Sequence, residues 1–321
     1  MAATQALSHP REPFVIPIQD ARPPNWVGEL HGLAATTPAE AARDALTIRL
    51  AAGDSFSRIE VSFGDVPAMD ILTFQQTVAE AYRSIFDLLG RLPTPYPVRF
   101  WAFIPEIHAH MGAGLDRYMA FNAGRFAAYS ARYGGRQALS RSVATASAVG
   151  FGEERLVLHC LAGTEPGAPL ENPRQVPAYN YSRRYGPLPP CFARATRIAD
   201  GGGQGQRLLV GGTASIRGED SLHVGDLAGQ VKETLGNLAS LVSYACGGGT
   251  GTAREPELEA WLPRFRELRI YRPRRAEADR ILDLVVPSFR GVSRVELLEA
   301  ELCRAELLVE VEGVADITSV A

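Results

Sequence analysis

Residues 207–242 constrain the fold of this chain more than any other stretch, because they place a buried strand, a polar loop and an amphipathic helix in direct succession. The apolar run 208–210 ends in Gly211-Gly212, which is typical of a covered strand whose end lies close to another part of the molecule. Asp226 can cap a helix, and apolar side chains then follow at helical spacing: Leu227, Val231, Leu235, Leu238, Leu241 and Val242.

The loop between this strand and this helix carries small, hydroxyl and cationic side chains, namely Thr213, Ala214, Ser215 and Arg217. Groups of this kind at the exit of a strand often bind an anionic ligand. An ordinary connection with one solvated arginine has the same composition. The stretch alone therefore leaves both interpretations open.

The rest of the chain shows two successive series of strands and helices. The first half predicts strands at 45–50 and 58–63, a helix at 70–91, a strand at 97–103, a helix at 114–133 and strands at 142–149 and 155–161. The second half predicts strands at 193–198 and 207–210, the helix from 226, a strand at 268–271, a helix at 276–285 and two strands within 294–314. Residues 1–40 are rich in proline and small residues. We therefore expect an arm over 1–40, a first unit over 41–150 and a second unit over 151–321.

The ends of the two halves can be compared directly. Aligned without gaps, residues 143–163 and 295–315 both end in an apolar strand, and Leu158 falls on Glu310. An apolar residue replaced by a carboxylate at an equivalent strand position marks the second unit as the candidate site.

Glu310 and Glu312 lie two residues apart on the predicted strand and so share one face, with Val309 and Val311 on the other. If the valines face the helices, the glutamates face the opposite side of the sheet. That side is either a solvated outer face or a functional surface. A partly buried carboxyl group has a raised pKa and can donate a proton near neutral pH.

Residues 179–197 interleave arginines with tyrosines. A small ring with two carboxylates needs two separated cations and flat walls, and this segment can supply both. Arg194 is the first choice, because its small and apolar neighbours in C-F-A-R-A-T indicate a strand that faces the interior. Arg290 and Arg294 are further candidates. The net charge of −3 argues against a nucleic-acid partner.

The cysteines and histidines predict no metal site. The four cysteines are scattered, without a C-x-x-C pair, which also argues against disulfides and favours a reducing compartment. His108 and His110 have no third ligand near them in sequence. No stretch is apolar enough for a signal or a membrane helix, so we expect a cytoplasmic protein without a membrane partner.

Four blocks together resemble the chorismatase family of the YjgF-like superfamily. They are G-T-A-S-I-x-G followed by G-D-x-x-x-Q-x-x-x-T-x-x-N (212–237), YNYSRRYGPLPPCFARATR (179–197), ELCRAELLVEVEGVA (301–315) and GLDRYMAFNAGR (114–125). The resemblance implies an α+β fold of two YjgF-like (chorismate-mutase-like) ββαβαβ units, with mixed sheets and helices packed on one face. It also implies release of pyruvate from chorismate without metal or organic cofactor.

The resemblance implies roles for particular residues. Glu310, the first glutamate of V-E-V-E-G, is the expected general acid on the enolpyruvyl group. The expected substrate-binding residues are Arg125, Tyr179, Arg183, Tyr185, Arg194, Thr213, Ala214, Ser215 and Arg290. Because the duplicated unit buries surface that single-unit relatives bury in a trimer, we expect a monomer or a weak oligomer.

Two positions bear on the product. In the resembling family Ala214 is typical of members that hydrolyse chorismate to a dihydroxycyclohexadiene carboxylate, and Cys303 is typical of members that form an aromatic hydroxybenzoate. Cys303 can relay a proton during aromatisation, although a free cysteine is most often an inert buried thiol. We therefore expect 3-hydroxybenzoate, with 4-hydroxybenzoate as a second product to look for. The alternatives are the hydrolase, a YjgF-type imine deaminase and a small-acid binding protein.

Overall fold

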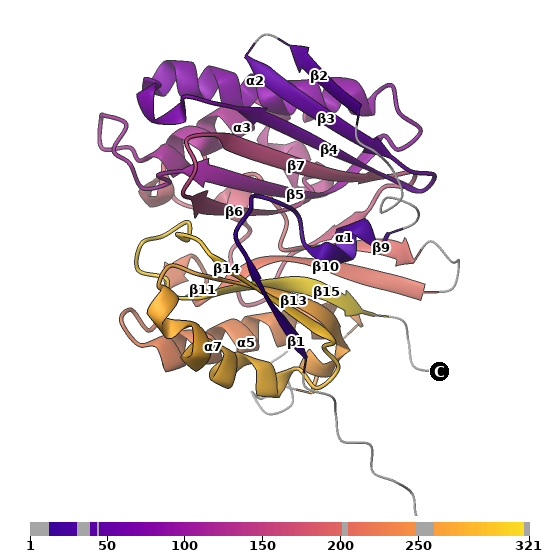
Figure 1. The fold of residues 1–321 in the computed structure, drawn as a ribbon, viewed down its shortest axis with the longest axis vertical. Coiled ribbons are helices and arrows are strands. Elements are labelled where there is room, and N and C mark those ends of the chain that lie inside the picture. Colours follow the sequence, from indigo (N-terminus) through magenta and orange to yellow (C-terminus); the bar gives the residue numbers. More distant parts are fainter. Residues whose placement is uncertain (1–12, 31–38, 44, 201–204, 248–259, 318–321) are drawn as a thin grey trace, which may run out of the picture.

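The computed structural model describes residues 13–30, 39–43, 45–200, 205–247 and 260–317. They form four layers, in which two sheets face one another and helices cover the outer face of each (Figure 1). Three apolar cores follow from this order, one between each sheet and its helices and one between the sheets.

The first sheet has six strands and lies beneath α2 (Ile71–Leu89), α3 (Arg117–Tyr133) and α4 (Arg136–Ser142). Asp70 caps α2 by accepting hydrogen bonds from the backbone N–H groups of Leu72 and Thr73. The strands lie in the order β2 (Ala39–Arg43), β3 (Leu46–Ala52), β4 (Phe56–Phe63), β7 (Leu156–Gly163), β5 (Tyr96–Pro105) and β6 (Thr145–Phe151).

The second sheet has seven strands and packs on α5 (Leu227–Ala245) and α7 (Ala278–Val285). Their order is β1 (Phe14–Ile18), β14 (Arg294–Glu299), β13 (Phe265–Arg272), β15 (Glu310–Asp316), β10 (Gly205–Ala214), β9 (Ala195–Asp200) and β8 (Ala168–Leu170). The short strands β11 (Ile216–Arg217) and β12 (Asp220–Ser221) form a separate hairpin.

The two sheets repeat one topology. The series β3-β4-β7-β5-β6 in the first sheet has the same chain order and spatial order as β9-β10-β15-β13-β14 in the second. The predicted α+β fold with mixed sheets and helices on one face of each is confirmed. Each unit reads ββαβαββ, with one strand more than the predicted ββαβαβ.

Strand pairing corrects two of the expected boundaries. β7 pairs with β4 and β5, so the first sheet extends to Gly163 and the expected division at residue 150 falls inside β6. Within the expected arm, β1 joins the second sheet in parallel with β14, and α1 (Asn25–Gly28) follows it. Residues 1–12 and 31–38 of that arm lie outside the described residues.

The gapless alignment of Leu158 with Glu310 is wrong by one residue. Each sheet has a register shift at the corresponding place, between Pro97 and Arg99 in the first and between Phe265 and Glu267 in the second. Matching these shifts aligns Val157 with Glu310 and His159 with Glu312. Leu158 packs in the core under the helices, whereas Val157 faces the other sheet. A slip of one residue exchanges the two faces of a strand.

The N-terminal segment fills one side of the space between the sheets. The buried ring of His159 contacts the carbonyl oxygen of Ala21 through Nε2 at 2.8 Å, and burial lowers the pKa of this histidine to about 3. Arg269 donates to the carbonyl oxygen of Arg22 at 2.6 Å, and Glu296 accepts from the backbone N–H of Asn25 at 2.9 Å. Strand register pairs each of these residues with a counterpart in the other unit: His159 with Glu312, Arg269 with Trp101, and Glu296 with Ser147. Ser147 lines a cavity, whereas Trp101 packs against Trp26 of the N-terminal segment.

Candidate active site

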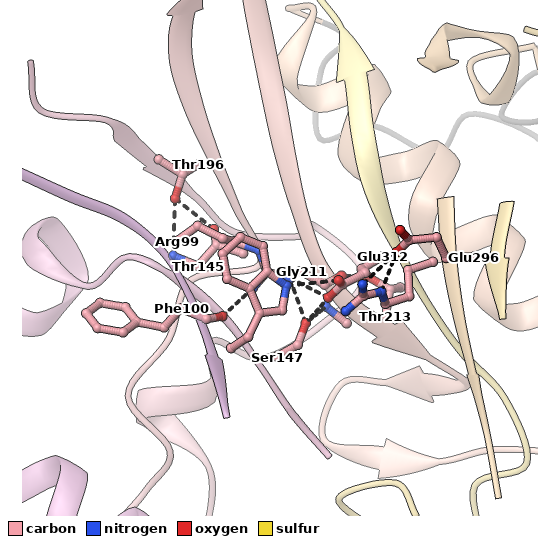
Figure 2. Close-up of polar contacts among 12 residues, drawn as sticks. Arg99, Phe100, Thr145, Ser147, Thr196, Gly211, Thr213, Glu296 and Glu312 are labelled. Carbon is pink, nitrogen blue, oxygen red and sulfur yellow. Dashed lines mark hydrogen bonds and ion pairs between the residues drawn. The ribbon is translucent and has the colours of Figure 1, made fainter. Parts of the chain in front are cut away.

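A cavity of about 300 Å³ lies where β6 of the first unit approaches β10 of the second. Its walls come from β6, β10, β15 and α3, from the segment 181–194 and from the loop 303–306. The hydroxyl groups of Thr145 and Thr196 lie 2.8 Å apart and join the two units nearby (Figure 2). Both units contribute walls, so neither unit forms the cavity alone.

Glu310 begins β15 and lines the cavity, with only 5% of its surface exposed. Its neighbours on the adjacent strands are Ala214 and Tyr271. Burial, followed by the nearby charge of Glu312, raises the pKa of Glu310 to about 8. The carboxyl group is therefore mostly protonated at neutral pH and can act as an acid.

Gly212 makes room for this carboxyl group. A Cβ atom built on Gly212 would lie 1.9 Å from Oε1 and 2.6 Å from Cδ of Glu310. β10 does not end at the two glycines, as the sequence predicted, but continues to Ala214 after a register shift between Val210 and Thr213. The glycines therefore mark a bulge against which the acid packs.

Glu312 faces the same side of the sheet as Glu310 but is held by three donors. Arg99 donates to it at 2.6 Å and the indole N–H of Trp101 at 2.9 Å, and Ser147 donates a further hydrogen bond (Figure 2). Val309 and Val311 pack in the core under α5, which confirms the predicted orientation of the strand.

Three arginines surround the cavity: Arg125, Arg194 and Arg304. Arg125 bonds to Asn122 at 2.6 Å, and Arg194 bonds to the hydroxyl group of Tyr181 at 2.6 Å. Each of the three arginines keeps one buried nitrogen that has no partner within the described residues. Three cationic side chains around one cavity favour an anionic ligand there.

Aromatic rings form the flat walls. The guanidinium group of Arg304 lies 3.9 Å from the centre of the Tyr185 ring, and that of Arg194 lies 5.2 Å from the centre of the Phe192 ring. Cys303 lies beside them, and burial raises the pKa of its thiol to about 12. The thiol is therefore protonated at neutral pH.

The structure brings six of the predicted site residues together in the cavity: Glu310, Cys303, Arg125, Tyr185, Arg194 and Ala214. Arg194 is buried, as predicted, but it lies just before β9 and not within a strand.

The other five predicted residues do not line the cavity. Tyr179 is buried in the core of the first unit, and Arg183 is exposed in a groove beside Pro187. The hydroxyl groups of Thr213 and Ser215 donate to the backbone carbonyls of Gly211 and Leu222, both at 2.9 Å. Arg290 is exposed on the loop after α7.

Sequence reasoning missed several lining residues. Tyr181, Phe192 and Arg304 lie within the blocks that carry the family resemblance, so the signal was present but was assigned to their neighbours. Ser147 and Tyr118 come from the first unit. Tyr118 lies in the resemblance block 114–125, but Ser147 lies in none of the four blocks, and only the packing of the two units brings it near β15.

A buried carboxyl group with a raised pKa, three lining arginines and aromatic walls are typical of an enzyme site for a small anionic ring. Comparisons with known proteins narrow this class. Residues 36–162 match the family model described as chorismatase FkbO/Hyg5-like, N-terminal. The chain is 33% identical over 249 residues to a 3-hydroxybenzoate synthase of Streptomyces hygroscopicus, a match that covers 75% of this chain and 69% of that protein.

Two further matches are to chorismatases as well. A chorismatase of Streptomyces rapamycinicus is 32% identical over 237 residues, covering 74% of this chain and 69% of that protein. A crystal structure of a chorismatase aligns with a TM-score of 0.72 at 25% identity, covering 87% of this chain and 80% of that one. The chain belongs to the chorismatase family and is an enzyme. In the described parts of the chain, no helix is long and apolar enough to cross a membrane.

Proposed function

We propose that this enzyme cleaves chorismate to pyruvate and 3-hydroxybenzoate, with Glu310 as the general acid. One observation carries the proposal: a carboxyl group with a pKa of about 8 lies in the same cavity as three arginines. Chorismate has two carboxylates on a small carbon skeleton, so it fits both the charge and the flat walls of the cavity. The names of the matched relatives agree with this substrate.

Protonation starts the reaction. Glu310 gives its proton to the methylene carbon of the enolpyruvyl group, which becomes a methyl group next to an oxocarbenium centre. The neighbouring ring hydroxyl oxygen then attacks the ring carbon that carries the ether, the ether bond breaks, pyruvate leaves and the hydroxyl proton returns to Glu310, which leaves an epoxide on the ring. Protonation of the epoxide oxygen breaks its bond to the carbon that first bore the hydroxyl group. Loss of the proton on the other epoxide carbon then makes the ring aromatic and returns that second proton to the protein. Pyruvic acid and hydroxybenzoic acid together contain all the atoms of chorismic acid, so the overall reaction consumes no water.

The arginines hold the carboxylates in place. Arg125 and Arg194 come from different units, so the two carboxylates of one substrate bridge the units. The buried surroundings strengthen these charge-assisted hydrogen bonds. Tyr185 and Phe192 supply flat walls for the ring.

Two lining residues bear on the product. Cys303 is protonated at neutral pH, so it can pass a proton only by donating its own while receiving another. This is the relay that we assign to it during aromatisation. Ala214 also lines the cavity. By the family resemblance it favours the alternative, hydrolysis to the dihydroxycyclohexadiene carboxylate.

The test is an assay of purified protein with chorismate. Coupled detection measures pyruvate, and chromatography separates 3-hydroxybenzoate, 4-hydroxybenzoate and the diene acid. We expect pyruvate and 3-hydroxybenzoate in equal amounts, and at least a hundredfold loss of kcat in Glu310→Gln. Near wild-type turnover in that variant contradicts the acid assignment. Thermal stabilisation by chorismate without pyruvate indicates a binding protein, and ammonia release from imines indicates a deaminase.

A further inference from the structure

The carboxyl groups of Glu310 and Glu312 on β15 both face the space between the two sheets, but they differ in the hydrogen bonds that they accept. Glu312 accepts charge-assisted or neutral hydrogen bonds from Arg99, Trp101 and Ser147. Glu310 accepts no hydrogen bond from any residue in the described ranges, and it faces the cavity. Donors stabilise a carboxylate, so this arrangement favours charge on Glu312 and a proton on Glu310.

Ser147 lies next to the carboxyl groups of both Glu310 and Glu312, so the direction of its hydrogen bonds determines which of them receives its proton. Its Oγ accepts from the backbone N–H of Gly212 at 2.8 Å and from Arg99 at 2.7 Å (Figure 2). A hydroxyl group has one proton and two lone pairs, so the single proton of Ser147 goes to Glu312. Ser147 therefore has no proton to offer Glu310, although it lines the same cavity.

We propose that Glu312 is a positioning residue for the reaction: its negative charge, held by Arg99, Trp101 and Ser147, acts together with burial to keep Glu310 protonated for catalysis. This inference rests on the proposed role of Glu310 as the acid. It assigns a function to the second glutamate of V-E-V-E-G.

The other groups around Glu310 cannot replace this charge. Burial keeps three of them neutral at neutral pH: Tyr271 on β13, Tyr118 on α3 and Cys303 in the loop after β14. The cations are Arg99 on β5, Arg194 in the segment before β9, and Arg125 and Arg304 on the cavity walls; Arg99 and Arg194 lower the pKa of Glu310.

Two more acids line the cavity, Asp116 and Glu306, but neither is among the charges that shift the pKa of Glu310. Asp116 accepts from the backbone N–H of Met119 at 2.7 Å, and Glu306 accepts from Ser221 at 2.7 Å. Among the described residues, the negative charge that acts on Glu310 is that of Glu312.

The size of the effect follows from the strand. Alternate residues on a strand are ~7 Å apart, and at an effective dielectric constant of about 20 two unit charges at this distance shift a pKa by about 1.7 units. Removing the charge of Glu312 should therefore lower the pKa of Glu310 from about 8 to roughly 6.

The experiment compares the pH dependence of kcat in the wild type, Glu312→Gln and Glu296→Gln. Glu296 is the matched control, because it is equally buried on the same sheet and pairs with Arg269 at 2.6 Å, yet it does not line the cavity. In the wild type, kcat falls as Glu310 loses its proton above pH of about 8. In Glu312→Gln the same fall should come one to two pH units lower, with kcat near pH 5.5 largely kept. Glu296→Gln should leave the fall where it is.

Two results overturn the proposal: an unshifted profile in Glu312→Gln, or the same shift in Glu296→Gln. If Glu312→Gln does not fold, the double variant Arg99→Met/Glu312→Leu replaces the buried pair by apolar side chains, a change that folded proteins often tolerate. In this double variant the fall of kcat should also move to lower pH, but by less than in Glu312→Gln, because the opposing charge of Arg99 is lost too. Absence of chorismate turnover in the wild type contradicts the proposed function instead, so the two failures are distinguishable.

Discussion

Gly212→Ala tests the geometry of the acid in the most direct way. The added Cβ would lie 1.9 Å from Oε1 and 2.6 Å from Cδ of Glu310, and 3.1 Å from Oγ of Ser147. Non-bonded carbon and oxygen atoms need more than 3 Å, so the carboxyl group must move by roughly 1 Å or more into the cavity. A displacement of this size at a catalytic group costs about a hundredfold in rate. We therefore expect kcat for pyruvate release to fall about a hundredfold.

The fold should survive this change, because the group that gives way is the end of a side chain beside a cavity and not a backbone atom. Gly64→Ala is the control, since a Cβ at Gly64 would meet no heavy atom within 4 Å. Both variants should melt within a few degrees of the wild type by circular dichroism. A Gly212→Ala enzyme that keeps more than half of the wild-type kcat refutes the placement of Glu310 against this glycine.

Four further predictions concern the residues of the cavity and the N-terminal segment that lies between the two sheets. Arg194→Gln should raise KM for chorismate about ten- to a hundredfold by removing one charge-assisted contact, whereas Arg290→Gln should leave KM unchanged in the same assay. Cys303→Ala should lower the share of 3-hydroxybenzoate in favour of the diene acid by chromatography, and an unchanged aromatic yield removes the relay from this thiol. Glu310→Gln should be more stable than the wild type by ~2–4 kcal/mol near pH 8 in denaturant titrations. Folding raises the pKa of Glu310 from about 4.5 to about 8, so the wild type loses stability as the pH rises through this range. Equal stability of the wild type and Glu310→Gln at pH 8 would contradict this cost of burying a charged Glu310. Light scattering at micromolar concentration should show a monomer or weak oligomer, because residues 13–30 fill the space between the sheets opposite the cavity, and a stable trimer contradicts this.

The local elements of this protein could be predicted from the sequence because their signals are local. The helix predicted over 70–91 matches α2 within two residues at each end, and the apolar spacing after Asp226 locates the start of α5 within one residue. The alternation at Glu310 and Glu312 correctly places both glutamates on the face away from the helices. The aromatic and cationic residues around Arg194 also marked the wall of the cavity. In each case, residues close together in the sequence determine the local structure.

Tertiary structure alone decided how distant residues meet. Strand pairing with β5 and β13 makes Val157, and not Leu158, the counterpart of Glu310. The alignment without gaps misses this because the connection from β14 to β15 is longer than that from β6 to β7. Likewise Ser147 and Arg99 reach Glu312 across more than 160 residues of chain. The proposed acid can thus be selected from the sequence of β15. Whether that acid holds its proton depends on burial and on partners from the other unit, which exist only once the two sheets have packed.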